Sequence, residues 1–96
     1  MPHAQALVLA ADPSAPAAAM VSRLAGEFEA EWSAEAGYVR LDEGICTFHA
    51  WPEGLRLDAF ASTNEQLGQV ERFIARQLAS GDIPLHVDWR RRPGAA

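Results

Sequence analysis

Lysine is absent from the 96-residue sequence, so all eight basic residues are arginine. Without lysine the chain can form no lysine Schiff base and lacks the phosphate-binding lysine of a P-loop, and its sequence contains no glycine-rich phosphate loop. The 13 acidic residues give a net charge of −5, which makes free duplex nucleic acid a poor partner. We therefore expect no nucleic-acid partner.

Cysteine and long apolar runs are also scarce. The single cysteine, Cys46, cannot form an internal disulfide. Near the N-terminus the longest purely apolar run covers residues 6–11, far below the roughly 18 residues that a membrane span requires, and no basic segment precedes it. These absences predict a cytoplasmic protein without a membrane partner.

A chain of 96 residues has room for one hydrophobic core, because two smaller cores would each bury too little apolar surface to offset chain entropy. We therefore expect a single α+β domain over residues 1–89. The run of three arginines that follows is too short to indicate nucleic-acid binding. We interpret residues 90–96 as a disordered C-terminal tail.

Hydrophobic periodicity predicts the element order β-α-β-β-β-β-α-β. The expected strands cover residues 4–10, the vicinity of Trp32, and residues 38–42, 45–51, 55–61 and 85–89. The expected helices cover residues 15–29, with Ser14 as N-cap, and the stretch between Thr63 and Ser80; in an alternative, Trp32 ends the first helix. The order predicts a two-layer α+β sandwich in which two helices cover one face of an antiparallel or mixed sheet.

Strand parity separates a covered face of this sheet from an open one. Cys46 and Phe48 fall on the side expected to meet the helices, whereas His49 and Trp51 fall on the other side. Cys46 and His49 therefore point apart, which argues against a Cys–His catalytic pair or a shared metal. We interpret Cys46 as a small buried apolar side chain.

The expected open face gathers residue types that bind small molecules. Its candidate ligand-binding residues are Tyr38, Arg40, Trp51, Arg56 and Phe60, and its candidate acid–base pair is His49 with Asp58, beside Asp42, Thr47 and the more distant His86 and Asp88. Arginine suits an anionic group, aromatic rings stack on flat ligands, and histidine beside aspartate transfers protons. The simpler alternatives are a solvated sheet face with cross-strand ion pairs, or a dimer interface centred on Trp51 and Phe60.

The sequence contains no spacing typical of a metal site. No two of its three histidines stand four residues apart on a predicted helix, and Cys-x-x-Cys pairs are absent. Glu27 and Glu31 would chelate weakly if the first helix reached them, but we favour the simpler interpretation of an exposed charged face. We expect neither a metal nor a cofactor.

Several spaced residues match a known pattern. They are Leu24-x-x-x-Phe28, Gly44-x-Cys46-x-Phe48-x-Ala50, Leu55-x-Leu57, Leu67 and Val70-Glu71 in a capped helix, and Val87-Asp88-Trp89. With this pattern the sequence resembles, over about residues 7–89, a small bacterial family catalogued as domain of unknown function 2218. The resemblance implies a stand-alone α+β domain without an established activity, whose relatives tend to accompany siderophore-uptake and flavin-dependent iron-release proteins.

The sequence departs from that family at its histidines. Relatives usually carry a His-Phe-x-His-Lys element at the end of the first helix and a His-Leu pair in the second. The corresponding residues here are Glu27, Phe28, Ala30 and Glu31, and Gln77 with Leu78. A function that depends on the family's histidines is therefore lost here or has moved to the carboxylates, together with Gln77.

Three hypotheses of function follow. The leading one is a cytoplasmic accessory domain that binds a small molecule or a partner protein on its open sheet face, in a setting of iron–siderophore metabolism. The second is a small cofactor-free lyase, isomerase or cyclase in which His49 is the general base, Asp58 orients it, and Arg40 or Arg56 holds an anionic substrate. The third is a structural homodimer, whose interface would lack any pocket.

Overall fold

The computed structural model of the chain describes residues 1–92, and the end of the predicted tail, residues 93–96, lies outside them. The strands are β1 (His3–Leu9), β2 (Glu29–Ser33), β3 (Ala36–Arg40), β4 (Gly44–Trp51), β5 (Gly54–Ala61) and β6 (Arg90–Arg92). The helices are α1 (Ser14–Leu24) and α2 (Asn64–Ala79). The order of helices and strands matches the predicted order, although the last strand is Arg90–Arg92 and not the predicted residues 85–89.

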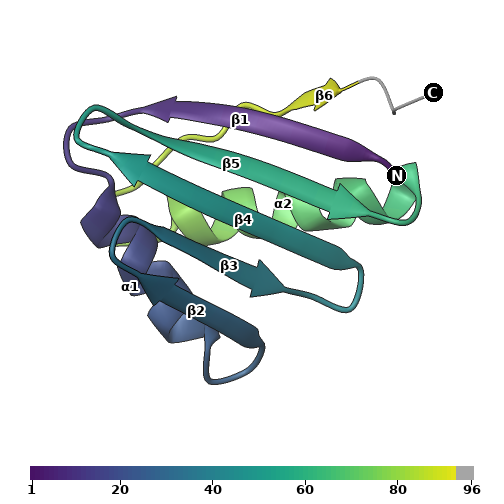
Figure 1. Ribbon diagram of the computed structural model, residues 1–96, viewed down its shortest axis with the longest axis horizontal. Helices are drawn as coiled ribbons and strands as arrows, with labels where there is room; N and C mark the ends of the chain where they lie inside the picture. Colours follow the sequence, from purple (N-terminus) through teal and green to yellow (C-terminus); the bar gives the residue numbers. More distant parts are fainter. Residues whose placement is uncertain (93–96) are drawn as a thin grey trace.

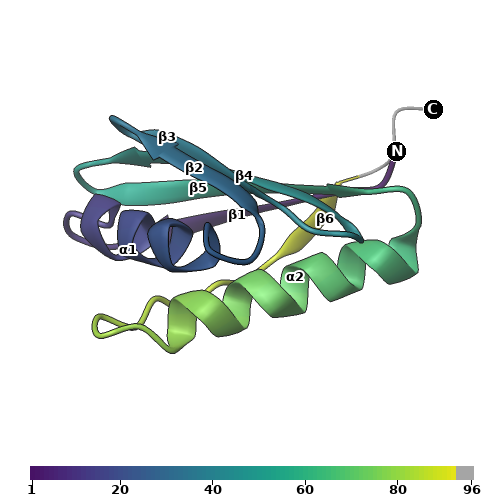
Figure 2. The same ribbon diagram turned by 90° about the horizontal axis from the view of Figure 1, so that it is seen from below.

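The six strands form one sheet in the order β2-β3-β4-β5-β1-β6 (Figure 1). Every neighbouring pair is antiparallel, so the sheet is not mixed. Both helices lie on the same face of this sheet (Figure 2). The structure is thus the expected two-layer α+β sandwich with one open sheet face.

The core lies between the sheet and the helices. One row of inward residues runs across four strands through Val39, Cys46, Ala59 and Ala4, and all four are fully buried. Three of these four side chains are small, which leaves room for the apolar stripe of α2 to approach the strands. The interpretation of Cys46 as a buried apolar side chain is confirmed.

The first helix is shorter than predicted. It ends at Leu24 instead of continuing to residue 29, and Glu29–Ser33 forms β2, with Trp32 on the strand. Inward Ala30 and Trp32 pack against the core, which stabilises this segment as a strand of the sheet. The tight turn after β2 uses Ala34, which adopts a left-handed φ of 56°.

The two helices begin differently. Ser14 is the first residue of α1 and not its N-cap; Pro13 occupies the N-cap position, without a side-chain cap bond. In α2, Thr63 is the N-cap, and its hydroxyl accepts a hydrogen bond from the Gln66 amide at 3.1 Å. Thr63 therefore caps the first turn of α2 through its side chain. Neither described helix is long and apolar enough to cross a membrane.

The C-terminal segment differs most from prediction. Residues 85–89 do not form a strand, although Leu85, Val87 and Trp89 still pack against the core. The Leu85 amide donates to a carbonyl of α2 at 3.0 Å, and the Trp89 indole donates to the Glu71 carbonyl, also at 3.0 Å. The segment alternates because it packs beside α2, not because it pairs in the sheet.

The sixth strand instead follows this segment. Arg90–Arg92 pairs antiparallel with His3–Gln5 at the edge of the sheet. The prediction of a disordered tail is therefore wrong for residues 90–92. A run of three arginines gave no indication of a strand in the sequence. These residues carry no apolar side chains, and their backbone pairing with the exposed edge of β1 orders them instead.

Candidate functional site

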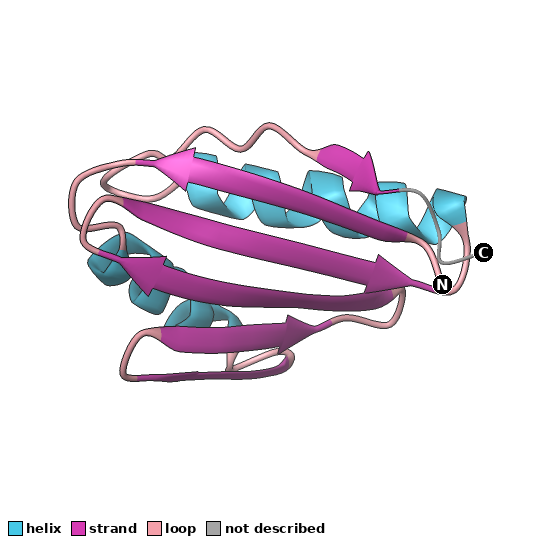
Figure 3. Cartoon of the chain, turned by 45° about the horizontal axis from the view of Figure 1, so that its top comes forward, coloured by secondary structure: helices cyan, strands magenta, loops and turns pink. Residues whose placement is uncertain are grey.

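The open face is built by strand register. Residues one position away from the buried row point outward, so that Tyr38, Thr47, Asp58 and Gln5 follow one another across β3, β4, β5 and β1. In Figure 3 both helices lie behind the strands, which leaves this face uncovered. The face thus carries most of the residues predicted for it, divided into separate groups.

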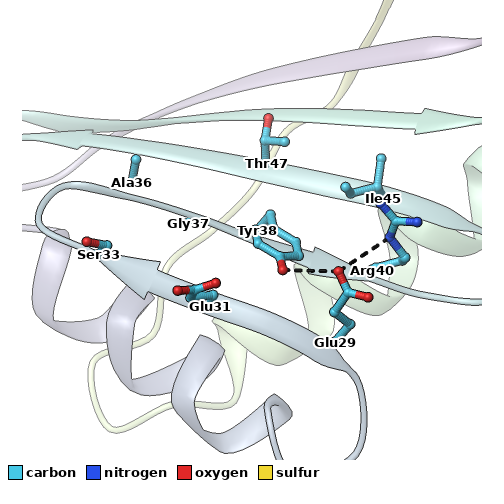
Figure 4. Close-up of a pocket in the computed structure, with 9 residues that line it drawn as sticks. All are labelled: Glu29, Glu31, Ser33, Ala36, Gly37, Tyr38, Arg40, Ile45 and Thr47. Carbon is cyan, nitrogen blue, oxygen red and sulfur yellow. Dashed lines mark hydrogen bonds and ion pairs between the residues drawn. The ribbon is translucent and has the colours of Figure 1, made fainter.

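The first group surrounds an open cavity of about 550 Å³ at the β2 edge of the face, which we call the β2–β4 cavity. Its lining comes from three strands and consists of Glu29, Glu31, Ser33, Ala36, Gly37, Tyr38, Arg40, Ile45 and Thr47 (Figure 4). Small residues of β3 form much of the surface between the polar groups. Tyr38 and Arg40, two of the predicted ligand-binding residues, belong to this cavity.

Glu29 is already engaged by its neighbours. The Tyr38 hydroxyl donates to Glu29 Oε2 at 3.1 Å, and Arg40 Nε lies 3.9 Å from the same oxygen (Figure 4). The hydrogen bond to the Glu29 carboxylate, followed by desolvation and the negative charges of Glu29 and Glu31, raises the pKa of Tyr38 above its ordinary value. The phenol therefore keeps its proton and is held over β2.

Glu31 is in a different position. Its residue pairs with Tyr38 across the β2–β3 ladder, and its side chain is exposed at the rim of the cavity beside Ser33 (Figure 4). Within residues 1–92, no hydrogen bond or ion pair holds the Glu31 carboxylate. Glu31 thus offers an unbonded carboxylate to the same cavity in which the Glu29 carboxylate is already bonded.

The second group centres on Asp58. This carboxylate accepts hydrogen bonds from His3 Nε2 at 2.8 Å, from Gln5 at 3.1 Å and from Arg56 Nε at 3.0 Å. The His3 ring stacks on Phe60 with a centroid separation of 4.4 Å. Partial burial alone would raise the pKa of Asp58, but the hydrogen bonds from His3 and Arg56 outweigh it, so the pKa of Asp58 lies below its ordinary value.

This group contains two residues that sequence reasoning missed, His3 and Gln5. Both lie on β1, which is 55 and 53 residues from Asp58 along the chain but pairs directly with β5. Outward parity on the first strand was the available signal. That parity is informative only once β1 is known to be the neighbour of β5.

The predicted acid–base pair is not assembled. His49 is exposed and lies opposite Arg56 in the β4–β5 ladder, whereas Asp58 lies opposite Thr47. In the part of the chain that the structure describes, no hydrogen bond joins His49 to Asp58. Asp58 instead bonds His3, so the arrangement in which Asp58 orients His49 is not present.

Trp51 is separate from both groups. It lies opposite Gly54 at the end of the β4–β5 hairpin, where a Cβ on Gly54 would come within 2.7 Å of the indole. Trp51 therefore packs over glycine in the hairpin instead of lining the β2–β4 cavity. His86 and Asp88 are exposed on the segment outside the sheet.

The carboxylates considered for chelation are also apart in the fold. Glu27 lies in the loop between α1 and β2, and Glu31 lies on β2, so the two do not share a helix face. Gln77 receives a hydrogen bond from Arg23 at 3.2 Å. Among the described residues, no three His, Cys, Asp or Glu side chains form a group that could hold a metal ion.

Comparison with known proteins finds a similar solved structure and a matching family. The structure is similar to the NMR structure of PA4090 from Pseudomonas aeruginosa, with a TM-score of 0.76, 16% sequence identity, and coverage of 94% of this chain and 96% of that one. At this identity the likeness shows the fold alone. No curated protein matches the chain. Residues 5–90 match the family described as an uncharacterized protein conserved in bacteria, so the chain belongs to the DUF2218 family.

Proposed function

We propose that this protein is a binding domain that holds a small molecule in the β2–β4 cavity of its open sheet face. The observation that carries the proposal is a free carboxylate, Glu31, at the rim of a cavity of about 550 Å³ whose other acid is already bonded. The cavity is shallow and open, but its volume lies within the range of about 300–1,000 Å³ of small-molecule sites, and it shares with them a largely apolar lining with few polar groups.

The lining favours a ligand with a flat, weakly polar body and a basic amine. Ala36, Gly37 and Ile45 offer apolar surface, and the Tyr38 ring adds an aromatic wall. Glu31 supplies the charge that would pair with an ammonium group. Because Arg40 is drawn toward Glu29, it leaves the negative charge of Glu31 uncompensated within the described residues.

Two alternatives have less support. The enzyme hypothesis relied on His49 oriented by Asp58, and these side chains are not bonded to each other in the described structure. The structural-homodimer hypothesis expected a face without a pocket, and the β2–β4 cavity argues against it. A setting in iron–siderophore metabolism stays a prediction from family resemblance and carries none of this argument.

The test uses two probes with similar bodies and opposite charge, 2-phenylethylamine and 3-phenylpropionate. Each is titrated into the ¹⁵N-labelled full chain while amide shifts are followed by NMR. We expect the amine to shift amides of β2 and β3, with the carboxylate having little effect there. Glu31→Gln should weaken amine binding about tenfold, the scale of one charge-assisted hydrogen bond.

The matched control is Glu53→Gln, which makes the same chemical change at an exposed turn residue outside the cavity. It should leave amine binding unchanged. Equal shifts of the β2 and β3 amides from both probes, amine shifts that lie elsewhere, or equal weakening by the two variants would each contradict the proposal.

A further inference from the structure

The C-terminal arginine run is divided between the two faces of the sheet. Arg91 points to the covered side and forms two bonds to the Glu71 carboxylate on α2, at 2.7 and 3.1 Å. Arg90 and Arg92 lie opposite Gln5 and His3, respectively, in the β1–β6 ladder. Since Gln5 and His3 belong to the open face, Arg90 and Arg92 belong to it as well.

These two arginines meet a third in one cavity. A depression of about 400 Å³, here called the arginine cavity, is lined by Gln5, Ala6, Leu7, Arg56, Asp88, Arg90 and Arg92. Three guanidinium groups and one carboxylate therefore line it, although the whole chain carries a net charge of −5. The local charge is opposite in sign to that of the protein.

The arginines are also available for a ligand. Arg56 uses its Nε to bond Asp58 at 3.0 Å, which positions the guanidinium and leaves its terminal nitrogens uncommitted within residues 1–92. Over the same residues, neither Arg90 nor Arg92 forms an ion pair. Leu7 has 58% of its surface exposed and adds an apolar wall to the same cavity.

We propose that the arginine cavity is a binding site for a small anionic molecule that carries a carboxylate or phosphate group next to a short apolar part. Guanidinium groups bind both anions through paired N–H donors, which is the chemistry that the two groups share. Asp58 acts as a positioning residue because it fixes Arg56. No lining residue is shared with the β2–β4 cavity, so this site does not rest on the proposed function.

The experiment titrates citrate and inorganic pyrophosphate into the ¹⁵N-labelled full chain, with sodium chloride at matched ionic strength as reference. We expect amide shifts at residues 5–7, 56 and 88–92. The double variant Arg90→Gln/Arg92→Gln should weaken binding at least about tenfold, whereas Arg72→Gln/Arg76→Gln, with the same charge change on exposed α2 residues, should have a much smaller effect.

The outcomes separate the sources of the anion. Shifts with citrate alone assign a carboxylate ligand, shifts with pyrophosphate alone assign a phosphate ligand, and shifts with both support the shared chemistry. No shift with either probe, equal shifts with sodium chloride, or equal weakening by the two double variants overturns the site, because the last two results indicate general screening of charge.

One further variant keeps the test decisive if the double variant detaches β6. Asp88→Asn removes the only carboxylate of the lining and lies outside the sheet. It should tighten binding of the probe about threefold, since a repulsive charge is lost. Unchanged or weaker binding in Asp88→Asn contradicts the proposal whatever happens to β6.

Discussion

The two faces of this sheet are made by the same strands but differ in burial and in polarity. On the covered side, Cys46 and Ala59 are fully buried neighbours, whereas the adjacent residues Thr47 and Asp58 face outward as a polar pair. Apolar burial on the first side supplies most of the folding free energy. The second side is thus free to carry charge and hydrogen-bonding groups with little effect on the core.

The open face itself is divided by charge. Its β2 edge carries Glu29 and Glu31, and its opposite edge carries Arg90 and Arg92 on β6. The Asp58 group lies between them on β5 and β1. A sheet with charges of opposite sign at its two edges offers two chemically distinct binding surfaces, which is why we propose two separate ligands.

The largest expected contrast compares a leucine on each face. Leu57→Ala removes a fully buried side chain and should lower the free energy of unfolding by about 2–5 kcal/mol, because a cavity remains in the core. Leu7→Ala truncates a side chain with 58% exposure and should change it by less than about 0.5 kcal/mol. Urea unfolding of both variants measures the contrast, and similar losses would contradict the division between the faces.

A smaller effect is expected from the strongest polar cluster of the open face. Asp58→Asn should lower the free energy of unfolding at neutral pH by about 1–2 kcal/mol, because its bonds to His3 and Arg56 lose their charge. The folded pKa of Asp58 lies below the ordinary 3.8, so its contribution is complete above that pH and is lost as the pH falls through the folded value.

The difference between wild type and Asp58→Asn should therefore shrink on acidification. Urea unfolding at pH 6 and pH 3 measures it, with Asp82→Asn, an exposed aspartate outside the cluster, as the control. A difference that stays constant or grows toward pH 3 would show that the hydrogen bonds to Asp58 do not stabilise the folded state through its charge.

The sequence predicted those elements whose local pattern and tertiary environment agree. β4 and β5 lie within one residue of the expected strands because their alternation coincides with burial on one face. β2 was harder to place, since its glutamates and alanine also suit a helix and its inward residues are only partly buried. Residues 85–89 were predicted to be a strand and are not one. Their apolar residues alternate because they pack beside α2, and this alternation looks the same in the sequence as that of a strand paired in a sheet.

The residue types of the open face were predictable from the sequence, but the contacts between its side chains were not. Parity correctly grouped Tyr38 with Arg40, whereas the partner of Asp58 depended on strand order, which local patterns do not encode. His49 was expected to pair with Asp58 because both point outward on adjacent strands. β1 lies on the other side of β5 and brings His3 to the carboxylate instead.

The smallest expected effect tests the charge pattern at the β2 edge directly. Tyr38 is the only tyrosine, so the ultraviolet absorbance of tyrosinate reports its ionisation alone. Glu29→Ala removes the acceptor that contributes most to the raised pKa and should lower it toward the ordinary value of 10.0. Glu31→Ala should lower the pKa of Tyr38 less, because Glu31 acts only through its charge.

Arg40→Ala should shift the pKa of Tyr38 in the opposite direction. The positive charge of Arg40 lowers this pKa, so its loss should raise the pKa further. Titration of the three variants and wild type should therefore rank the pKa of Tyr38 in a definite order. We expect the lowest pKa in Glu29→Ala, then Glu31→Ala, then wild type, and the highest in Arg40→Ala. If all four proteins share one pKa, these side chains do not interact on the open face in solution. The predicted order would support the arrangement at the β2 edge, in which Glu29 accepts the Tyr38 hydrogen bond and Glu31 acts on Tyr38 through its charge alone.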